Sequence, residues 1–107
     1  MKTNEEDVIK LINEGTPVLA VVDAYKSFEA YKDGIYEGQT DRKDKFIGRH
    51  VVLVTGFDST ADGVHYWIIQ NSWGTLWGQN GFGHIIRKCS RVGNKPSMFL
   101  EIIKLVV

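Results

Sequence analysis

Cysteine and proline are scarce in this chain, and long apolar runs are missing. Its 107 residues include one cysteine, Cys89, and two prolines. A single cysteine excludes an internal disulfide and favours a reducing compartment. No apolar run approaches the roughly 20 residues that a membrane-spanning helix needs. The first residues predict a helix start and lack the hydrophobic segment of a signal peptide.

An excess of charge of either sign is also lacking. Thirteen basic residues balance thirteen acidic ones, which gives a formal net charge of zero at pH 7. We therefore expect no nucleic-acid partner and no membrane surface as a partner. A hydrophobic share of 43% and a charged share of 24% are ordinary for a globular protein. Because there is no repeat and no long linker, residues 1–107 are predicted to form a single domain.

The beginning of the chain predicts a short amphipathic helix. Thr3 and Glu6 have the spacing of a capping box, and Val8, Leu11 and Ile12 follow as an apolar stripe. The next features are short and lie in this order: a helix end at Gly15 and Pro17, a buried strand at residues 18–23, a helical turn carrying Phe28 and Tyr31, a break at Asp33 and Gly34, and a polar loop at residues 37–48.

The middle of the chain predicts a β-hairpin. Residues 51–57 and 64–70 form two strands, and turn residues at 59–63 join them. His50 stands just before the first strand, and Asn71 follows the second. Antiparallel pairing returns the second strand to the level where the first begins. We therefore expect the His50 and Asn71 side chains to touch.

A touching His50 and Asn71 suit acid–base chemistry. The Asn oxygen accepts a hydrogen bond from one imidazole N–H, which fixes the orientation and tautomer of the ring and leaves the other nitrogen to face a nucleophile. Trp73 would cover this bond and strengthen it by excluding water. Taken without their surroundings, the two residues would more often be a strand-end histidine with satisfied hydrogen bonds and an ordinary turn asparagine.

The residues around Asn71 carry a motif. The run at 66–82, YWIIQNSWGTLWGQNGF, resembles the C-terminal signature of papain-like cysteine peptidases. Residues 15–18, 20–24 and 34–36 are similar to the helix, first strand and following turn of that family, in order. The resemblance covers most of the chain and implies the right-hand domain of the family. That domain has an α+β fold, in which an antiparallel, β-barrel-like sheet carries a short N-terminal helix at its side.

The resemblance implies a role for each matching residue. In this family a Cys, a His and an Asn act together, so His50 is expected to be the general base and Asn71 its orienter. A second group is expected to shield the site or contact the substrate: Trp73, Trp77, Val21 and Arg49. The two indoles would form the floor of the cleft on the leaving-group side.

Parts of the family's catalytic machinery are missing from these 107 residues. The nucleophilic Cys and the oxyanion-hole Gln belong to the family's first, Cys-bearing domain, so this chain is predicted to be inactive alone. Arg49 and Val51 flank His50, where the family usually has Asp or Asn and then Ala. A guanidinium beside the imidazole would oppose its positive charge unless it points to solvent. Cys89 is not expected to replace the nucleophile, because it follows His50 in the chain and lacks the family's flanking residues.

The remaining polar residues have simpler interpretations. His65 and His84 are predicted to be ordinary strand residues, because no second type of ligand stands at the spacing of a metal site. We therefore expect no metal and no other cofactor. Residues 41–45, a run of alternating acidic and basic side chains, are predicted to form a solvated loop.

The sequence leaves two classes of function open. The chain is either a part of a cysteine peptidase that contributes His50 and Asn71 to acyl transfer, or a non-catalytic module that binds a partner through the former domain interface. A truncated product without a role is a third possibility. Expected partners are a Cys-bearing domain, or a second copy bound through an exposed face that carries His50, Trp73 and Trp77. Peptide or protein substrates are expected only for the complete enzyme. The compartment stays open, because the family is usually lysosomal, vacuolar or secreted.

Overall fold

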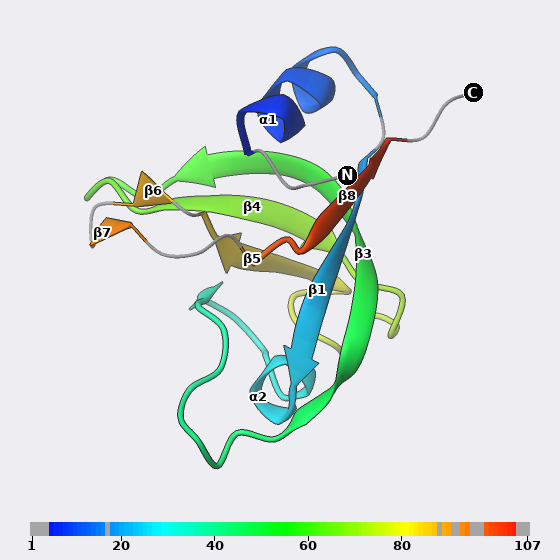
Figure 1. Ribbon diagram of the computed structural model, residues 1–107, viewed down its shortest axis with the longest axis vertical. Coiled ribbons are helices and arrows are strands. Elements are labelled where there is room, and N and C mark those ends of the chain that lie inside the picture. The colour runs from blue at the N-terminus through cyan, green and yellow to red at the C-terminus, as the bar shows by residue number, and fades with distance from the viewer. Residues whose placement is uncertain (1–4, 17, 88, 91–92, 95–97, 105–107) are drawn as a thin grey trace.

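An open, six-stranded sheet organises the molecule (Figure 1). The computed structural model describes residues 5–16, 18–87, 89–90, 93–94 and 98–104. The elements in these ranges follow in chain order: α1 Glu5–Asn13, β1 Val18–Tyr25, α2 Lys26–Glu29, β2 Ile35–Tyr36, β3 Phe46–Ser59, β4 His65–Gln70, β5 Phe82–Ile86, β6 Cys89–Ser90, β7 Gly93–Asn94 and β8 Glu101–Lys104.

The sheet has the strand order β2-β5-β4-β3-β1-β8, and β6 pairs with β7 in a separate small sheet. All neighbours in the large sheet are antiparallel except β2 and β5, which run parallel. The predicted α+β class with a short N-terminal helix is confirmed. The barrel-like description needs correction, because the sheet is mixed and does not close on itself. The short β2, with two residues, pairs with β5 alone and leaves one edge of the sheet open.

The predicted N-terminal helix is confirmed as α1. Glu5, Glu6 and Asp7 stand in its first turn, where acidic side chains interact favourably with the helix dipole. Val8 is fully buried and anchors the helix to the sheet, with Ile9, Leu11 and Ile12 packed beside it. The predicted capping residue Thr3 and the predicted stop at Pro17 lie outside the described residues. No helix in the described ranges is long and apolar enough to cross a bilayer.

The alternation of residues in β1 determines where the core lies. Val18, Ala20, Val22 and Ala24 are buried, whereas the residues between them are only partly buried. In a strand, successive side chains point to opposite faces, so the buried set defines the core face of the sheet. The predicted strand at residues 18–23 is therefore confirmed and extends to Tyr25.

The β3 strand is longer than the sequence predicted. It begins at Phe46 within the segment expected to be loop, because residues 46–49 continue the ladder with β1. Gly48 and Phe46 oppose consecutive residues of β1, so Ile47 is an extra, bulged residue. Gly48 has φ 135, a backbone conformation that glycine adopts without steric cost. Residues 46–49 carry no clear strand pattern, because glycine interrupts the alternation of side chains.

A second bulge, at Thr55, sets the faces of β3. Val54 and Gly56 oppose consecutive residues of β4, so Thr55 is the extra residue in that ladder. Val54 and Phe57 are three positions apart and both contribute to the core, which regular alternation would not allow. His50 opposes the buried Val22 of β1 and lies on the core face at the other end of the same strand.

Candidate active site

The predicted contact between His50 and Asn71 is confirmed. His50 Nε2 donates a hydrogen bond to Asn71 Oδ1 over 2.6 Å. The contact arises because β4 ends at Gln70 opposite Leu53, which brings the next residue of the chain to the level of Val52, two positions from His50. With Nε2 carrying the proton, Nδ1 is the nitrogen that can accept one. An imidazole held in this way has the orientation that general-base chemistry requires.

Asn71 is held in place from both sides. Its backbone N–H donates to the carbonyl of Gly81 over 2.9 Å, which continues the pairing of β4 with β5. The residue is only 6% exposed, and no hydrogen-bond acceptor among the described residues satisfies its Nδ2. An unsatisfied buried donor costs about 1–3 kcal/mol. The residue therefore holds the imidazole at some expense of stability, which is common at functional sites.

Aromatic rings enclose the imidazole. The Trp73 indole stacks on His50 with 4.4 Å between ring centroids and an interplanar angle of 27°. The predicted cover over the hydrogen bond is therefore present, and Trp73 remains 39% exposed on its outer side. Phe28, from α2, lies beneath both rings, 6.5 Å from His50 and 5.6 Å from Trp73 between centroids. These contacts lower the local dielectric around the hydrogen bond.

Trp77 is buried, and the expectation that it would be largely exposed is wrong. It is only 6% exposed, and its Nε1 donates to the carbonyl oxygen of Phe28 over 2.8 Å. Gly83 makes room for it, because a Cβ at that position would come within 2.7 Å of the indole. The motif identified the residue type, but the direction of the side chain depends on α2, which lies far away in sequence. Trp77 therefore packs against the site from within and contributes little exposed surface to it.

Arg49 and Val21 lie on the other face of the sheet from His50. Arg49 alternates with His50 along β3, and its side chain is 73% exposed with Nε 3.7 Å from Asp23 Oδ1. The guanidinium therefore points to solvent, so it does not oppose a charged imidazole. Val21 pairs with Val51 on the same outer face. Within the described residues, neither side chain lines the space around His50 and Asn71.

Comparison with known proteins places this arrangement in a family. The model of the papain family of cysteine proteases matches residues 1–100. The chain belongs to the papain family of cysteine proteases. It is 36% identical over 86 residues to a protein named cathepsin B-like CP3 of Giardia intestinalis, covering 80% of this chain and 28% of that protein. It is 37% identical over 81 residues to cathepsin L of Sarcophaga peregrina, covering 74% of this chain and 23% of the relative.

The fold agrees with solved structures of the papain family. Procathepsin B S9 of Trypanosoma congolense superposes with a TM-score of 0.77 and 30% sequence identity, covering 95% of this chain and 32% of that one. The bromelain protease of Ananas comosus, solved with the inhibitor E64, gives a TM-score of 0.71 and 26% identity over 97% of this chain and 46% of that one. The chain therefore spans roughly a quarter to a half of these papain-family relatives.

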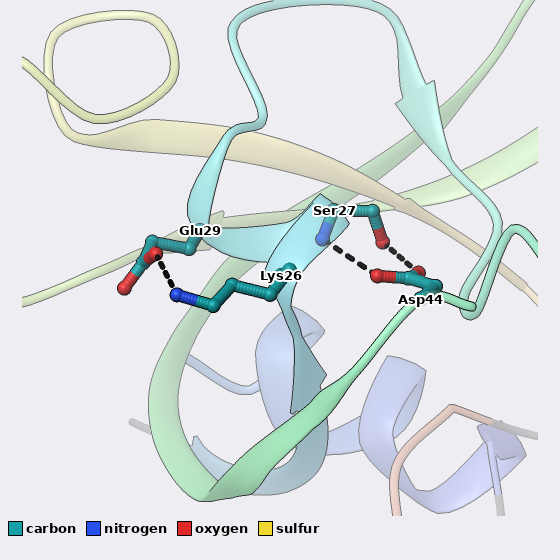
Figure 2. Close-up of polar contacts among 4 residues, drawn as sticks. All are labelled: Lys26, Ser27, Glu29 and Asp44. Carbon is teal, nitrogen blue, oxygen red and sulfur yellow. Dashed lines mark hydrogen bonds and ion pairs between the residues drawn. The ribbon is translucent and has the colours of Figure 1, made fainter.

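Asp44 supports the site, although no pattern in the sequence indicated this role. Residues 41–45 were expected to be a solvated loop, but Asp44 is buried and caps the start of α2 (Figure 2). Its Oδ1 accepts the backbone N–H of Ser27 over 2.9 Å, and its Oδ2 accepts the Ser27 hydroxyl and the N–H of Thr40. Burial raises the pKa of Tyr36 above 10.0, so its hydroxyl stays protonated and donates to Ser27 Oγ over 2.7 Å. Within the charged run at residues 41–45, nothing distinguishes Asp44 from its neighbours, so the sequence carries no signal for this role.

The capping by Asp44 should make stability depend on pH in the acid range. Burial acts to raise the pKa of Asp44, but the hydrogen bonds from Ser27 and Thr40 outweigh it and hold the pKa below the usual 3.8. A group with a lowered folded-state pKa stabilises the fold above its unfolded pKa and loses that effect as pH falls through the folded value. We expect Asp44→Asn to lower the free energy of unfolding at pH 7 and to bring it closer to the wild-type value below about pH 4.

Urea unfolding at pH 7 and pH 3, followed by tryptophan fluorescence, measures this difference. The matched control is Asp33→Asn, which removes the same charge at an exposed position. A stability gap for Asp44→Asn that stays constant from pH 7 to pH 3 would contradict the assignment.

The other histidines and the cysteine lie away from the site. His65 and His84 are strand residues, as predicted; His65 hydrogen-bonds Ser59, and His84 stacks on Tyr66 with ring centroids 4.5 Å apart. The β5 strand starts beside Gln70 and ends beside Tyr66, so the backbone of Cys89 follows the end of β5 remote from Asn71. This position agrees with the expectation that Cys89 does not serve His50.

Proposed function

We propose that this chain supplies the histidine-bearing half of a cysteine peptidase that cleaves peptide bonds by acyl transfer. The observation that carries the proposal is the 2.6 Å hydrogen bond between His50 and Asn71 beneath the stacked Trp73. Family membership supports the reaction class, and the orientation of the imidazole supports the role of each residue. Asn71 orients the ring, and His50 transfers the protons.

The nucleophile in this proposal comes from a Cys-bearing domain. Its thiol passes a proton to His50 Nδ1, and the thiolate attacks the carbonyl carbon of the substrate to form a tetrahedral intermediate. The imidazolium then gives that proton to the leaving amine as the C–N bond breaks, which leaves a thioester on the cysteine. The same imidazole next takes a proton from water, whose oxygen attacks the thioester and releases the acid and the thiol.

An exposed apolar surface next to His50 supports docking of such a domain. Trp73, which stacks on His50, is 39% exposed, and Leu76, which lines the same pocket as Trp73, is 88% exposed. Exposed apolar clusters of this kind mark interaction surfaces. The partner we propose for this surface is the Cys-bearing domain, and a second copy of the chain is the competing occupant.

The test compares the chain alone with the chain joined to a Cys-bearing domain of the papain family. Alone, it should cleave no peptide and take no label from a thiol-directed peptide warhead at an active-site position, because the reaction lacks its nucleophile. Joined, it should cleave a peptide substrate, and the warhead should attach to the cysteine of the added domain. Intact-mass spectrometry locates the label. A stoichiometric, His50-dependent adduct on Cys89 in the isolated chain would overturn the assignment of the nucleophile.

The same experiment separates the alternative function. The exposed apolar surface would equally serve a non-catalytic module that binds a partner through this face. A joined or mixed complex that forms tightly, with the Cys-bearing domain correctly folded, but that cleaves nothing would favour that module. Cleavage that depends on His50 would favour the peptidase.

A further inference from the structure

We propose that a pocket beside His50 binds a lysine or arginine side chain of the substrate and that Glu29 is the residue that selects it. The proposal rests on the proposed function, because the pocket meets a substrate only if His50 takes part in cleavage. The pocket has a volume of about 430 Å³ and is lined by Glu29, Trp73, Leu76 and Trp77. Trp73 also stacks on His50, so one indole joins the pocket to the imidazole.

The walls of the pocket suit a long, flexible, cationic side chain. Trp73 and Trp77 meet edge to face with centroids 6.1 Å apart, and Leu76 is 88% exposed beside them. The aliphatic stem of lysine or arginine packs favourably on such apolar surface while its charged end stays near water. A cation within about 6 Å of an indole face gains further from the ring quadrupole. An aliphatic side chain would pack on the indoles and Leu76 but would gain no charge contact with the Glu29 carboxylate.

The position of Glu29 is determined by its neighbours on α2. The carbonyl oxygen of Phe28, one residue earlier, accepts a hydrogen bond from Trp77 Nε1, which holds the end of α2 against the indole wall. Asp44 fixes the start of the same helix through Ser27. In Figure 2, Glu29 and Lys26 lie on the side of α2 away from Asp44. The carboxylate is therefore kept at the pocket by a backbone tied at both ends.

A substrate cation can replace the present partner of Glu29. Lys26 Nζ lies 3.6 Å from Glu29 Oε1, and the two side chains are 60% and 57% exposed. Exposed ion pairs between residues three apart on a helix are weak, because water and salt screen them. An arriving guanidinium gains the same charge contact and, in addition, the indole walls. An acidic side chain would meet repulsion from Glu29.

Binding of small probes to the intact 107-residue chain tests the proposal without catalysis. The probes are N-acetyl-arginine amide, N-acetyl-norleucine amide and N-acetyl-glutamate amide, and the readout is the shift of the Trp73 and Trp77 indole N–H signals in titrations followed by NMR. We expect arginine amide to bind about fivefold more tightly than norleucine amide at low salt. That advantage should shrink in 1 M NaCl. Glutamate amide should bind most weakly.

Three variants make the test specific. Glu29→Gln should reduce the affinity for arginine amide to the level of norleucine amide, and Lys26→Gln should increase it. Glu14→Gln is the matched control, because it removes the same charge at an exposed position after α1 and should change nothing. Equal affinities for the three probes, or an arginine preference that survives Glu29→Gln, would overturn the proposal.

The two proposals can fail separately. The joined enzyme could cleave peptides in a His50-dependent way while the pocket shows no charge preference. That result would contradict the proposed cation pocket and support the proposed peptidase function. A Glu29-dependent preference for arginine amide in a chain whose joined form is inactive would remove the function and leave the pocket as a cation-binding site.

Discussion

Replacing His50 by alanine should lower kcat/KM of the joined enzyme by about 10²- to 10⁴-fold, the usual contribution of a positioned acid–base group. The loss is expected because His50 Nδ1 is the only proposed acceptor of the thiol proton and the only proposed donor to the leaving amine. Replacing Asn71 by alanine should lower kcat/KM by about 10²-fold, since the imidazole would keep its chemistry but lose its orientation. Initial rates over a range of substrate concentrations measure both effects.

The chain offers a matched control on the same hairpin. His65 lies at the end of β4 remote from the site, and its ring nitrogen hydrogen-bonds Ser59. His65→Ala should leave kcat/KM unchanged within the error of the assay. Circular dichroism of all three variants checks that the fold is retained. A fully active His50→Ala enzyme would refute the proposed mechanism, whatever the behaviour of Asn71→Ala.

Replacing Phe28 by alanine should lower the free energy of unfolding by about 3–5 kcal/mol, the range measured for truncating a buried phenylalanine. The side chain is 1% exposed, and its ring lies 5.2 Å from Tyr36, 5.1 Å from Trp77 and 5.6 Å from Trp73 between centroids. Truncation would leave a cavity beside Trp77 and under the Trp73 indole, which stacks on the imidazole. Domains are stable by only about 5–15 kcal/mol, so this variant should approach the limit of folding.

Urea unfolding followed by tryptophan fluorescence measures this loss. Leu76→Ala is the control, because Leu76 stands beside the same indoles but is 88% exposed, and its truncation should change stability by less than about 0.5 kcal/mol. A similar loss for both variants would mean that the aromatic cluster is not the support that the structure indicates. A loss below about 1 kcal/mol for Phe28→Ala would have the same meaning.

The pairing of His50 with Asn71 was predictable because it follows from the geometry of one hairpin. Two apolar segments of similar length with a turn between them predict antiparallel strands, and the ends of such strands must meet. The parts that could not be predicted depend on contacts between distant segments. Burial of Trp77 depends on the carbonyl of Phe28, and burial of Asp44 depends on the start of α2. Neither contact leaves a pattern within its own stretch of sequence.

The α+β class could also be predicted from the sequence, whereas the arrangement of strands in the sheet could not. Period-two alternation and family resemblance both indicate strands with a helix at the side. They do not reveal that the two residues of β2 run parallel to β5, because a pair that short has no periodicity to detect. The start of β3 was missed for a related reason, since the bulge at Ile47 breaks the alternation where the strand begins.

The bulge at Thr55 makes the site depend on the parity of the residue count in β3. Length changes in the turn at residues 60–63 would leave both strands in place, and loops commonly tolerate them. Removal of the one extra residue at 55 would instead rotate every earlier position of the strand to the opposite face. His50 would then leave the side that carries Asn71, and Arg49 would enter it. In this hairpin the turn tolerates changes in length, whereas the strand does not tolerate the loss of its single bulged residue, Thr55.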